Sequence, residues 1–486
     1  MKSSRRHGPP AGQRRPRSRG DRGRRALTAL LAAGCVGVAG WLHPHWVPAP
    51  GPGGDDLPAA RVLPAEAPAP AGAVRPDPAA PVPGAAEVAA AVGPALAGAP
   101  AGRRSVLVAD ALTGTPLLER DPDVPLVPAS NQKLVTALSL LTHADPRQRL
   151  RTTVVQGQEP GTVVLVAGGD TLLGPGRSDP DAVLGRAGVG TLAEATARAL
   201  AERGAGGPGT VRWDASLFTG PALNGAWAAG DVAAGQIGPV APMAFWSHRV
   251  PAGEGPSAAR PADAARDVAE VFAAELAARL AAHGVPAPVP EVAPGRAPEG
   301  AAELAAVESA PLAEQAGLML RDSDNHLAEV LSRLAARAAD RPASIAGGRA
   351  AAAEALEAHG VGTAGVELSD ASGMSLGNRI PARALEQVVR AMVTDPTGAL
   401  VPGARALPVA GGSGTLADRF DDDAERPGRG LARAKTGTLN SVVSLGGHVT
   451  TDGGRLLTFS VLLNEVTDPA AARDAVDRAV AALARL

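Results

Sequence analysis

Aromatic residues are scarce in this sequence, which has no Tyr, five Phe and five Trp among its 486 residues. A core must therefore be built mainly from closely packed Ala, Val and Leu side chains. The length allows two or three domains, at roughly 100 to 200 residues each. The composition thus permits a sizeable core without selecting a function.

Cysteine and net charge are scarce as well. The single cysteine, Cys35, excludes an internal disulfide and any cysteine-based metal cluster. The formal net charge of −2 provides neither a basic field for nucleic acid nor an acidic block. We therefore expect no nucleic-acid partner, no metal site and no cofactor.

Lysine is the third rarity. Among 47 Lys and Arg residues only Lys2, Lys133 and Lys435 are lysines. An Arg side chain stays protonated, whereas the compact ammonium of Lys can lose its proton where its surroundings lower its pKa. A lysine in such an Arg-rich chain therefore points to a position that needs a compact amine able to lose its proton.

The N-terminal part has the pattern of an export signal. Nine arginines lie within residues 1–25, and the uncharged, mostly apolar stretch 26–42 follows them. This stretch is at the lower limit of a membrane span, so an uncleaved anchor over 1–42 and a cleaved signal peptide are both open. A lipoprotein signal at Cys35 fits less well, because more apolar residues follow it. Residues 43–84, rich in Pro, Ala and Gly, are predicted to be a linker that holds the extracytoplasmic remainder of the chain away from the membrane.

Hydrophobic periodicity predicts a mixed region between about residues 151 and 300, and strong strand alternation near the C-terminus. The predicted elements are a hairpin over 105–118, a helix from Ser130, a strand over 162–167, a helix capped by Thr191 and Glu194 that stops at Gly204, a helix over 261–283, a helix after Asn325, a hairpin over 441–463 and a last helix from Pro469.

Ser130 and Lys133 lie three residues apart at the start of a predicted helix, so their side chains can touch. A serine hydroxyl needs a base to become a nucleophile, and a neutral lysine can serve if its pKa falls from about 10.4 to roughly 7 or 8. Burial, the helix N-terminus and a second cation such as Lys435 would all lower the pKa. Taken alone, this spacing more often marks a solvated helix start.

Two more short motifs follow. Ser323, Asp324 and Asn325 open another predicted helix, and these residue types are also the preferred N-caps. The run 435–438 (KTGT) begins the C-terminal strands, where a glycine lets the backbone approach a ligand closely. In isolation, helix capping and an ordinary edge strand are the more common explanations of these two motifs.

Together, S-x-x-K, S-D-N and K-T-G in this order form the set found in β-lactamases and penicillin-binding proteins. Over residues 85–486 the sequence resembles the class C penicillin-binding proteins, the D-alanyl-D-alanine carboxypeptidases and endopeptidases of peptidase family S13. The resemblance extends over the stretches PASNQKLVTALSLL, GGDTLL, SDNHLAE, SDASGMSLGNR, LPVAGGSGTLADRF and AKTGTLNSVVSLGGHV.

This resemblance implies an α+β fold. A transpeptidase/β-lactamase-like domain, with an antiparallel sheet flanked by helices, is expected over 85–150 and 306–486. An inserted mixed α/β domain is expected over 151–305, between the first two motifs. The implied activity is that of a serine-type D-Ala-D-Ala carboxypeptidase or endopeptidase, which acts on peptidoglycan stem peptides through an acyl-enzyme and is acylated by β-lactams.

The resemblance also implies a role for each motif residue. Ser130 would attack the carbonyl of the penultimate D-Ala, and Lys133 would accept its proton. Ser323 would relay a proton to the leaving amine, and Asn325 would bond Lys133 and the substrate amide. Lys435 would hold the terminal carboxylate. The further substrate contacts would come from Thr436, Gly437 and Thr438, with the backbone N–H groups of Ser130 and Thr438 as the oxyanion hole.

Outside the three motifs, Asp231 resembles the inserted-domain acid that meets the free amine of a diaminopimelate side chain. Three positions depart from the family pattern. Leu376 stands where an Arg is usual, Asp170 lacks the Pro that usually follows it, and Ala371 replaces a Gly. These departures concern the preference for a stem-peptide side chain more than the chemistry.

Two β-lactamase classes fit poorly. A class A β-lactamase needs a Glu four residues before an Asn, but Asn378 is the only Asn between the second and third motifs, and Met374 stands at that distance. A class C β-lactamase has Tyr where Ser323 stands, and this chain has no Tyr.

Three other hypotheses were weighed. The run 373–377 matches the G-x-S-x-G elbow of α/β-hydrolases, with His448 as a candidate base, but Pro381 interrupts the helix that should follow. A catalytically silent wall-binding protein on the same fold stays open, as does another β-lactam or D-amino-ester hydrolase. Labelling with a penicillin separates the silent protein from the enzyme.

Overall fold

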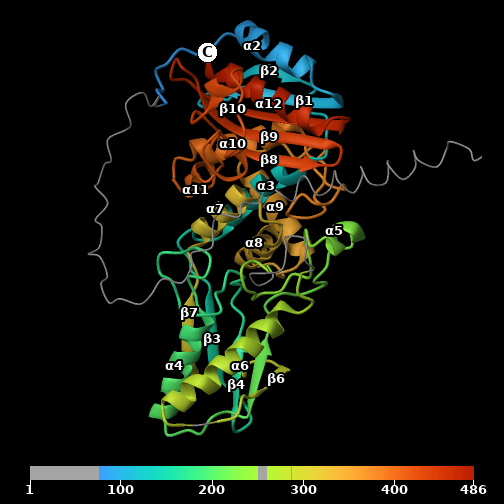
Figure 1. The fold of residues 1–486 in the computed structure, drawn as a ribbon. Helices are drawn as coiled ribbons and strands as arrows, with labels where there is room; N and C mark the ends of the chain where they lie inside the picture. Colours follow the sequence, from blue (N-terminus) through green and yellow to red (C-terminus); the bar gives the residue numbers. More distant parts are fainter. Residues whose placement is uncertain (1–75, 250–259, 286) are drawn as a thin grey trace, which may run out of the picture. The chain divides into compact units, whose positions relative to one another are not determined.

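Two five-stranded β-sheets, with helices packed against them, make up the protein. The structure is a computed structural model that describes residues 76–249, 260–285 and 287–486, all within one compact unit. The first sheet is antiparallel throughout, in the order β2-β1-β10-β9-β8 (Figure 1). Its strands are β1 (Ala101–Asp110), β2 (Pro116–Arg120), β8 (Ala432–Leu439), β9 (Val442–Thr450) and β10 (Leu456–Val466).

Helices cover both faces of this sheet. Successive residues of β1 point to opposite faces, as in any strand. Val106 packs with helices α2 (Ala85–Ala97) and α12 (Pro469–Ala484), whereas Leu107 packs with α10 (Ala382–Thr394). The sheet is therefore the middle layer between two helical layers, and both of its faces are apolar.

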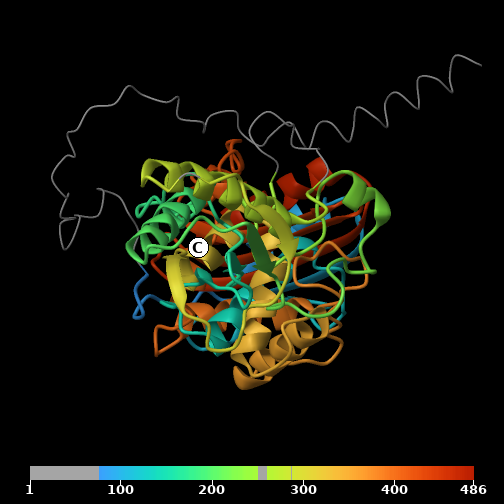
Figure 2. The same cartoon turned by 90° about the horizontal axis from the view of Figure 1, so that it is seen from below.

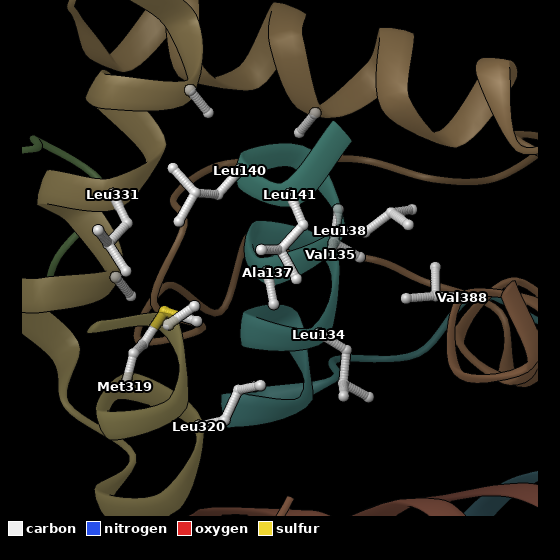
Figure 3. Close-up of a cluster of buried hydrophobic side chains, with 14 of the residues drawn as sticks. Leu134, Val135, Ala137, Leu138, Leu140, Leu141, Met319, Leu320, Leu331 and Val388 are labelled. Atoms are coloured by element: carbon white, nitrogen blue, oxygen red, sulfur yellow. The ribbon is translucent and has the colours of Figure 1, made fainter. Parts of the chain in front are cut away.

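Helix α3 (Gln132–His143) lies at the centre of the larger core. Its residues 132–141 are all buried, because other helices surround it and contact its side chains. Figure 3 shows Leu134, Leu138 and Leu141 of α3 among side chains from its neighbours, including Met319, Leu320, Leu331 and Val388. The neighbouring helices are α7 (Leu312–Asp322), α8 (Asn325–Ala338), α9 (Ile345–Ala358) and α10. The start of α3 is thus held rigidly.

The second sheet is mixed, with the order β6-β5-β4-β3-β7. Strands β3 and β4 and strands β3 and β7 are antiparallel, and β4-β5 and β5-β6 are parallel. Helices α4 (Val189–Glu202) and α6 (Ala264–Ala282) pack together and against it, as the view from below shows in green and yellow-green (Figure 2). The strands are β3 (Arg151–Gln156), β4 (Thr162–Val166), β5 (Thr210–Asp214), β6 (Glu291–Pro294) and β7 (Glu303–Glu308).

The predicted fold class is confirmed: an antiparallel sheet flanked by helices, with a second region built on a mixed sheet. One helix cap was predicted wrongly. Helix α4 begins at Val189 with Gly188 as its N-cap, and the Thr191 hydroxyl accepts a hydrogen bond from the Ser178 backbone N–H instead of capping the helix. Helix α2 was not predicted, because Pro94 inside it breaks the expected helical pattern.

The domain limits at 150/151 and 305/306 stay a proposal; β7, which completes the second sheet, ends at Glu308. In the part of the chain that the structure describes, every helix is too short or too polar to cross a membrane. The predicted export segment 1–42 and most of the predicted linker 43–84 lie outside the described residues.

Candidate active site

The backbone turns sharply just before Ser130. Ala129 has a left-handed φ of 48°, and residues 129–131 form a short 3₁₀ turn that leads into α3. Asn131 precedes α3 without capping it, and its Nδ2 donates to Ser444 Oγ on β9 at 2.5 Å. Strand β9 therefore holds the turn, which leaves the Ser130 side chain half-buried and Lys133 fully buried.

Lys133 Nζ contacts three oxygen atoms. It lies 3.1 Å from Ser130 Oγ, 2.8 Å from Asn325 Oδ1 and 2.6 Å from the carbonyl oxygen of Ser372. An amide or carbonyl oxygen can only accept, so two N–H groups of a neutral amine serve Asn325 and Ser372. The lone pair that is left can accept the Ser130 hydroxyl proton. The geometry thus suits a lysine that acts as a base toward this serine.

Burial shifts the Lys133 amine toward its neutral form. It lowers the pKa of Lys133 from 10.5 to about 8, while the carboxylates of Asp370, Asp324 and Glu329 oppose the change. At pH 7 about one amine in ten is then neutral, compared with about three in ten thousand at the ordinary value. The sequence had suggested Lys435 and the helix N-terminus as further causes; burial is the cause that the structure supplies.

The S-D-N motif spans the junction of helices α7 and α8, and each of its three residues has a different structural role. Ser323 ends α7 with a left-handed φ of 57° and is half-buried. Asp324 is the N-cap of α8 and accepts from the Leu327 backbone N–H. Asn325, the first residue of α8, points to Lys133, and its Nδ2 donates to the backbone oxygen of Gln236 at 3.1 Å. Capping therefore explains Asp324 but not Asn325.

The K-T-G motif lies on β8, at the edge of the first sheet. A Cβ at Gly437 would meet Ser444 Oγ at 2.2 Å and the Ser130 backbone nitrogen at 3.0 Å. Only a glycine thus lets β8 pass so close to Ser130. The next residue, Thr438, is exposed, which leaves it free to contact a ligand.

The Lys435 side chain is fully buried on the same strand. Its Nζ donates to the backbone oxygen of Thr436 at 2.9 Å, and Thr436 Oγ1 donates to Thr415 Oγ1 at 2.7 Å. Burial first, and then the positive charges of Lys133 and Arg419, lower the pKa of Lys435 well below its ordinary value. A bound anion would reverse this shift, because it would compensate the charge.

Asp231 lies on the short helix α5 (Ala229–Ala233) and is half-buried. The segment around it is tied to the site at both ends. Trp227 Nε1 donates to Asp370 Oδ2 at 3.0 Å, and the backbone oxygen of Gln236 accepts from Asn325. Asp231 therefore lies four residues from one anchor and five from the other.

Three residues of the site were not singled out from the sequence. Ser372 contributes a backbone carbonyl, which no side-chain motif reveals. Asp370 accepts from the backbone N–H groups of Gly373 and Ser375 and so shapes the loop. Glu329 accepts from the same loop, as described below. The stretch SDASGMSLGNR carried the family resemblance, but its side chains act through the backbone.

The α/β-hydrolase hypothesis is not supported by the local structure. Ser375 lies in an irregular segment, its Oγ accepts from the Gly377 backbone N–H, and the next helix begins only at Ala382. His448 lies on β9, where it pairs with Arg433 and Thr458 of the neighbouring strands. Neither the strand–turn–helix elbow nor a base beside Ser375 is present in these described segments.

Comparison with known proteins agrees with this site. The D-Ala-D-Ala carboxypeptidase 3 (S13) family matches residues 85–254 and 250–486. The chain belongs to this family. A carboxypeptidase of Mycobacterium tuberculosis is 38% identical over 393 residues, covering 79% of this chain and 81% of that protein. Carboxypeptidase DacB of Mycolicibacterium smegmatis is 36% identical over 461 residues, covering 94% and 95%.

Among solved structures, penicillin-binding protein 4 of Haemophilus influenzae superposes with a TM-score of 0.60 at 18% identity, covering 81% of this chain and 98% of that one. This likeness supports the fold. Together with the S13 match, the carboxypeptidase relatives identify a serine-type D-Ala-D-Ala carboxypeptidase that acts on peptidoglycan outside the cytoplasm. Within the described residues, no group of three or more His, Cys, Asp or Glu side chains is placed to hold a metal ion.

Proposed function

We propose that this S13 carboxypeptidase cleaves D-Ala-D-Ala stem peptides with Ser130 as nucleophile and Lys133 as base. The observation that carries the proposal is the buried Lys133 amine, which faces Ser130 Oγ while Asn325 Oδ1 and the Ser372 carbonyl oxygen occupy its two other directions. This arrangement supports Lys133 Nζ as the atom that receives the hydroxyl proton. The reaction then proceeds in two halves.

In the first half, the Ser130 proton moves to Lys133 Nζ as Oγ bonds to the carbonyl carbon of the penultimate D-Ala. The backbone N–H groups of Ser130 and Thr438 hold the oxyanion. The proton passes from Lys133, through the Ser323 hydroxyl, to the nitrogen of the terminal D-Ala. The amide bond breaks, free D-Ala leaves, and the acyl group stays on Ser130.

In the second half, water gives a proton to Lys133 as its oxygen bonds to the acyl carbon. The bond between that carbon and Ser130 Oγ then breaks, Lys133 returns the proton to Oγ, and the shortened peptide leaves with a new carboxylate. Lys435 holds the substrate's terminal carboxylate before the first step, and Thr436, Gly437 and Thr438 on β8 provide the neighbouring contacts. The buried Lys435 amine suits this role, because an anion next to it stabilises its charged form.

β-Lactams react with Ser130 through the same acylation step. Their ring carbonyl is attacked by Ser130, but the departing nitrogen stays attached to the acyl group, so the acyl-enzyme persists. An amine leaving group that belongs to a second stem peptide would give endopeptidase action by the same steps. The balance between the two activities depends on the substrate offered, because both use one site.

Asp231 is proposed to contact the free amine of a diaminopimelate side chain. Its support is the placement of α5 between Trp227 and Gln236. Trp227 contacts Asp370, and Gln236 contacts Asn325. Leu376, which is 62% exposed on the same loop as Asp370, offers no charge to a side-chain carboxylate. We therefore expect a stem-peptide side chain that has a free amine but no charged carboxylate to bind best.

The protein is proposed to be held at the outer face of the membrane by residues 1–42, or to be secreted after their removal. Detergent-free extraction of membranes from a strain that makes the full chain, followed by N-terminal sequencing, distinguishes the two. An anchored protein stays with the membranes and keeps its N-terminal region.

The catalytic proposal is tested with a fluorescent penicillin and with purified muropeptides. The full chain should label covalently, and Ser130→Ala should lose all label while keeping its circular dichroism spectrum. Mass spectrometry of muropeptide digests should show the loss of one alanine for carboxypeptidase action, or the splitting of cross-linked dimers for endopeptidase action. A folded wild-type protein that neither labels nor digests would indicate a catalytically silent wall-binding protein.

A further inference from the structure

Helix α8 carries two side chains that converge on Lys133 by different routes. Asn325 is its first residue and contacts the Lys133 amine directly. Glu329 lies four residues on, about one turn along the same helix, so both side chains lie on nearly the same face. Glu329 is 2% exposed, and its side chain makes no hydrogen bond to Lys133 or Ser130.

Glu329 instead holds the backbone of the opposite loop. Its Oε1 accepts from the Ala371 N–H at 2.9 Å and from the Ser372 N–H at 3.0 Å. The carbonyl oxygen of that same Ser372 accepts from Lys133 Nζ at 2.6 Å, the shortest of the three Lys133 contacts. One glutamate oxygen thus fixes the peptide units on both sides of the Ala371 Cα, next to the carbonyl that Lys133 uses.

The second Glu329 oxygen is not needed for this contact. Oε2 lies 3.8 Å from Arg333 Nη1, and Arg333 also donates to the Glu329 backbone oxygen. The two roles, an acceptor for the loop and a charge partner for Arg333, therefore reside on different atoms of one side chain. A substitution can separate them.

We propose that Glu329 is a positioning residue for the catalytic base: by holding the Ala371 and Ser372 amides, it directs the Ser372 carbonyl at Lys133 and so aims the lone pair of the amine at Ser130 Oγ. Asp370 holds the Gly373 N–H of the peptide unit that carries this carbonyl, and Asn325 keeps its own contact with Lys133. Loss of the Glu329 contacts should therefore misdirect the Ser372 carbonyl without freeing the loop completely. The inference rests on the proposed role of Lys133 as the base.

Two substitutions separate acceptor position from charge. Glu329→Gln keeps an oxygen at the same distance along the side chain but removes the negative charge. Glu329→Asp keeps the charge but withdraws the carboxylate by about 1.5 Å, the length of one C–C bond. Because a 1 Å misplacement can lower a rate by about a hundredfold, the positioning role predicts that Asp is the worse replacement.

The measurement is the rate of penicillin acylation of the full chain as a function of pH, normalised to folded protein by circular dichroism. We expect the plateau rate at high pH to stay within about threefold of wild type for Glu329→Gln and to fall at least tenfold for Glu329→Asp. Glu329→Gln should also move the midpoint of the pH profile to lower pH, since it removes one of the carboxylates that favour the charged Lys133 amine. The other charged groups that face this centre, Asp324, Asp370 and Lys435, are unchanged in both variants.

Glu386 provides a matched control. It is another 2% exposed glutamate, on α10, and its Oε1 accepts from Thr458 Oγ1 in the first sheet. The Gln and Asp variants at 386 should lower stability without changing the acylation plateau. Equal acylation plateaus for wild type and both Glu329 variants would mean that Glu329 has only a structural role. A low plateau for Glu329→Gln with a high plateau for Glu329→Asp would mean that its charge matters and its position does not. If the proposed enzymatic function itself is wrong, the wild-type protein will not be acylated by penicillin, which distinguishes this outcome from a failure of the Glu329 proposal.

Discussion

Lys133 Nζ and Asn325 Oδ1 lie 2.8 Å apart although 192 residues separate them in the chain. The second sheet is built almost entirely from the residues between these two positions, yet α3 and α8 pack directly against each other. The contact joins the first and second motifs into one site. It also makes the ionisation of the base sensitive to what stands at position 325.

Acylation by penicillin should depend on the ionisation of Lys133. The neutral amine is the active form, and its pKa is about 8 in the folded protein, so the rate should rise with pH and reach half its plateau near pH 8. Stopped-flow acylation between pH 6 and 10 measures this profile. Lys133→Arg, which cannot lose its proton in this range, should remain unlabelled throughout. A flat profile for the wild type would contradict lysine as the base.

Asn325→Asp should move this profile to higher pH. The substitution keeps the shape of the side chain but sets a carboxylate beside the Lys133 amine, which raises its pKa by favouring the charged form. Each unit of increase costs about tenfold in rate at pH 7, while the rate at high pH recovers. The same stopped-flow assay measures both. A midpoint that stays near pH 8 would mean that the two side chains do not interact in solution.

Gly437→Ala should impair acylation without unfolding the protein. The added Cβ would lie 2.2 Å from Ser444 Oγ and 3.0 Å from the Ser130 nitrogen, so either β8 or the turn at Ser130 must shift. A shift of this size should lower the acylation rate at least tenfold. Gly176→Ala is the control, because its Cβ would meet no atom within 4 Å. Equal acylation rates for the two variants would show that β8 does not border the nucleophile closely.

Asp231→Asn should affect peptides but not penicillin. A stem peptide with a free side-chain amine should show a KM raised roughly tenfold or more, the loss expected for a charge-assisted hydrogen bond of about 1.5 to 3 kcal/mol, with little change in kcat. The same peptide with its amine acetylated serves as the control and should bind both proteins equally. An unchanged KM for the free amine would remove Asp231 from the substrate site.

Leu138→Ala should destabilise the core around α3. Leu138 is fully buried among helices, and its truncation should lower the free energy of unfolding by about 2 to 5 kcal/mol, as measured by urea denaturation. Leu112→Ala is the control at a leucine that is 47% exposed, with an expected change within about 0.5 kcal/mol. Similar losses at the two positions would contradict the central place of α3 in the core.

The sequence predicted the parts of the site that depend on local spacing. Ser130 and Lys133 are one helical turn apart, so their proximity follows from the helix, and the order of three motifs indicated the family. The Ser372 carbonyl could not be predicted, because it is a backbone group oriented by a loop that only the folded chain brings to Lys133. Burial was one of three causes of a lowered Lys133 pKa that the sequence suggested, but its dominance could not be predicted, since burial depends on the helices packed around α3 and not on neighbours in sequence.

Local patterns misled in two elements. Thr191 and Glu194 have the spacing of a capping box, but α4 begins two residues before Thr191, and the hydroxyl bonds a distant backbone N–H instead. In α2, Pro94 breaks the helical pattern, yet Val88, Val92 and Leu96 bury enough apolar surface against α12 and the first sheet to keep the helix. Tertiary packing decided both cases.

The hydrogen bond from Trp227 to Asp370 ties the second-sheet region into the catalytic machinery. Asp370 Oδ2 has two donors, the Ser375 backbone N–H and the Trp227 indole, and one of them belongs to the insertion. Removing the second-sheet region would leave this buried carboxylate oxygen with only the Ser375 N–H of these two donors and would loosen the loop that carries Ser372. A shortened form of the protein should therefore keep Trp227, because its indole braces that loop from outside the first sheet.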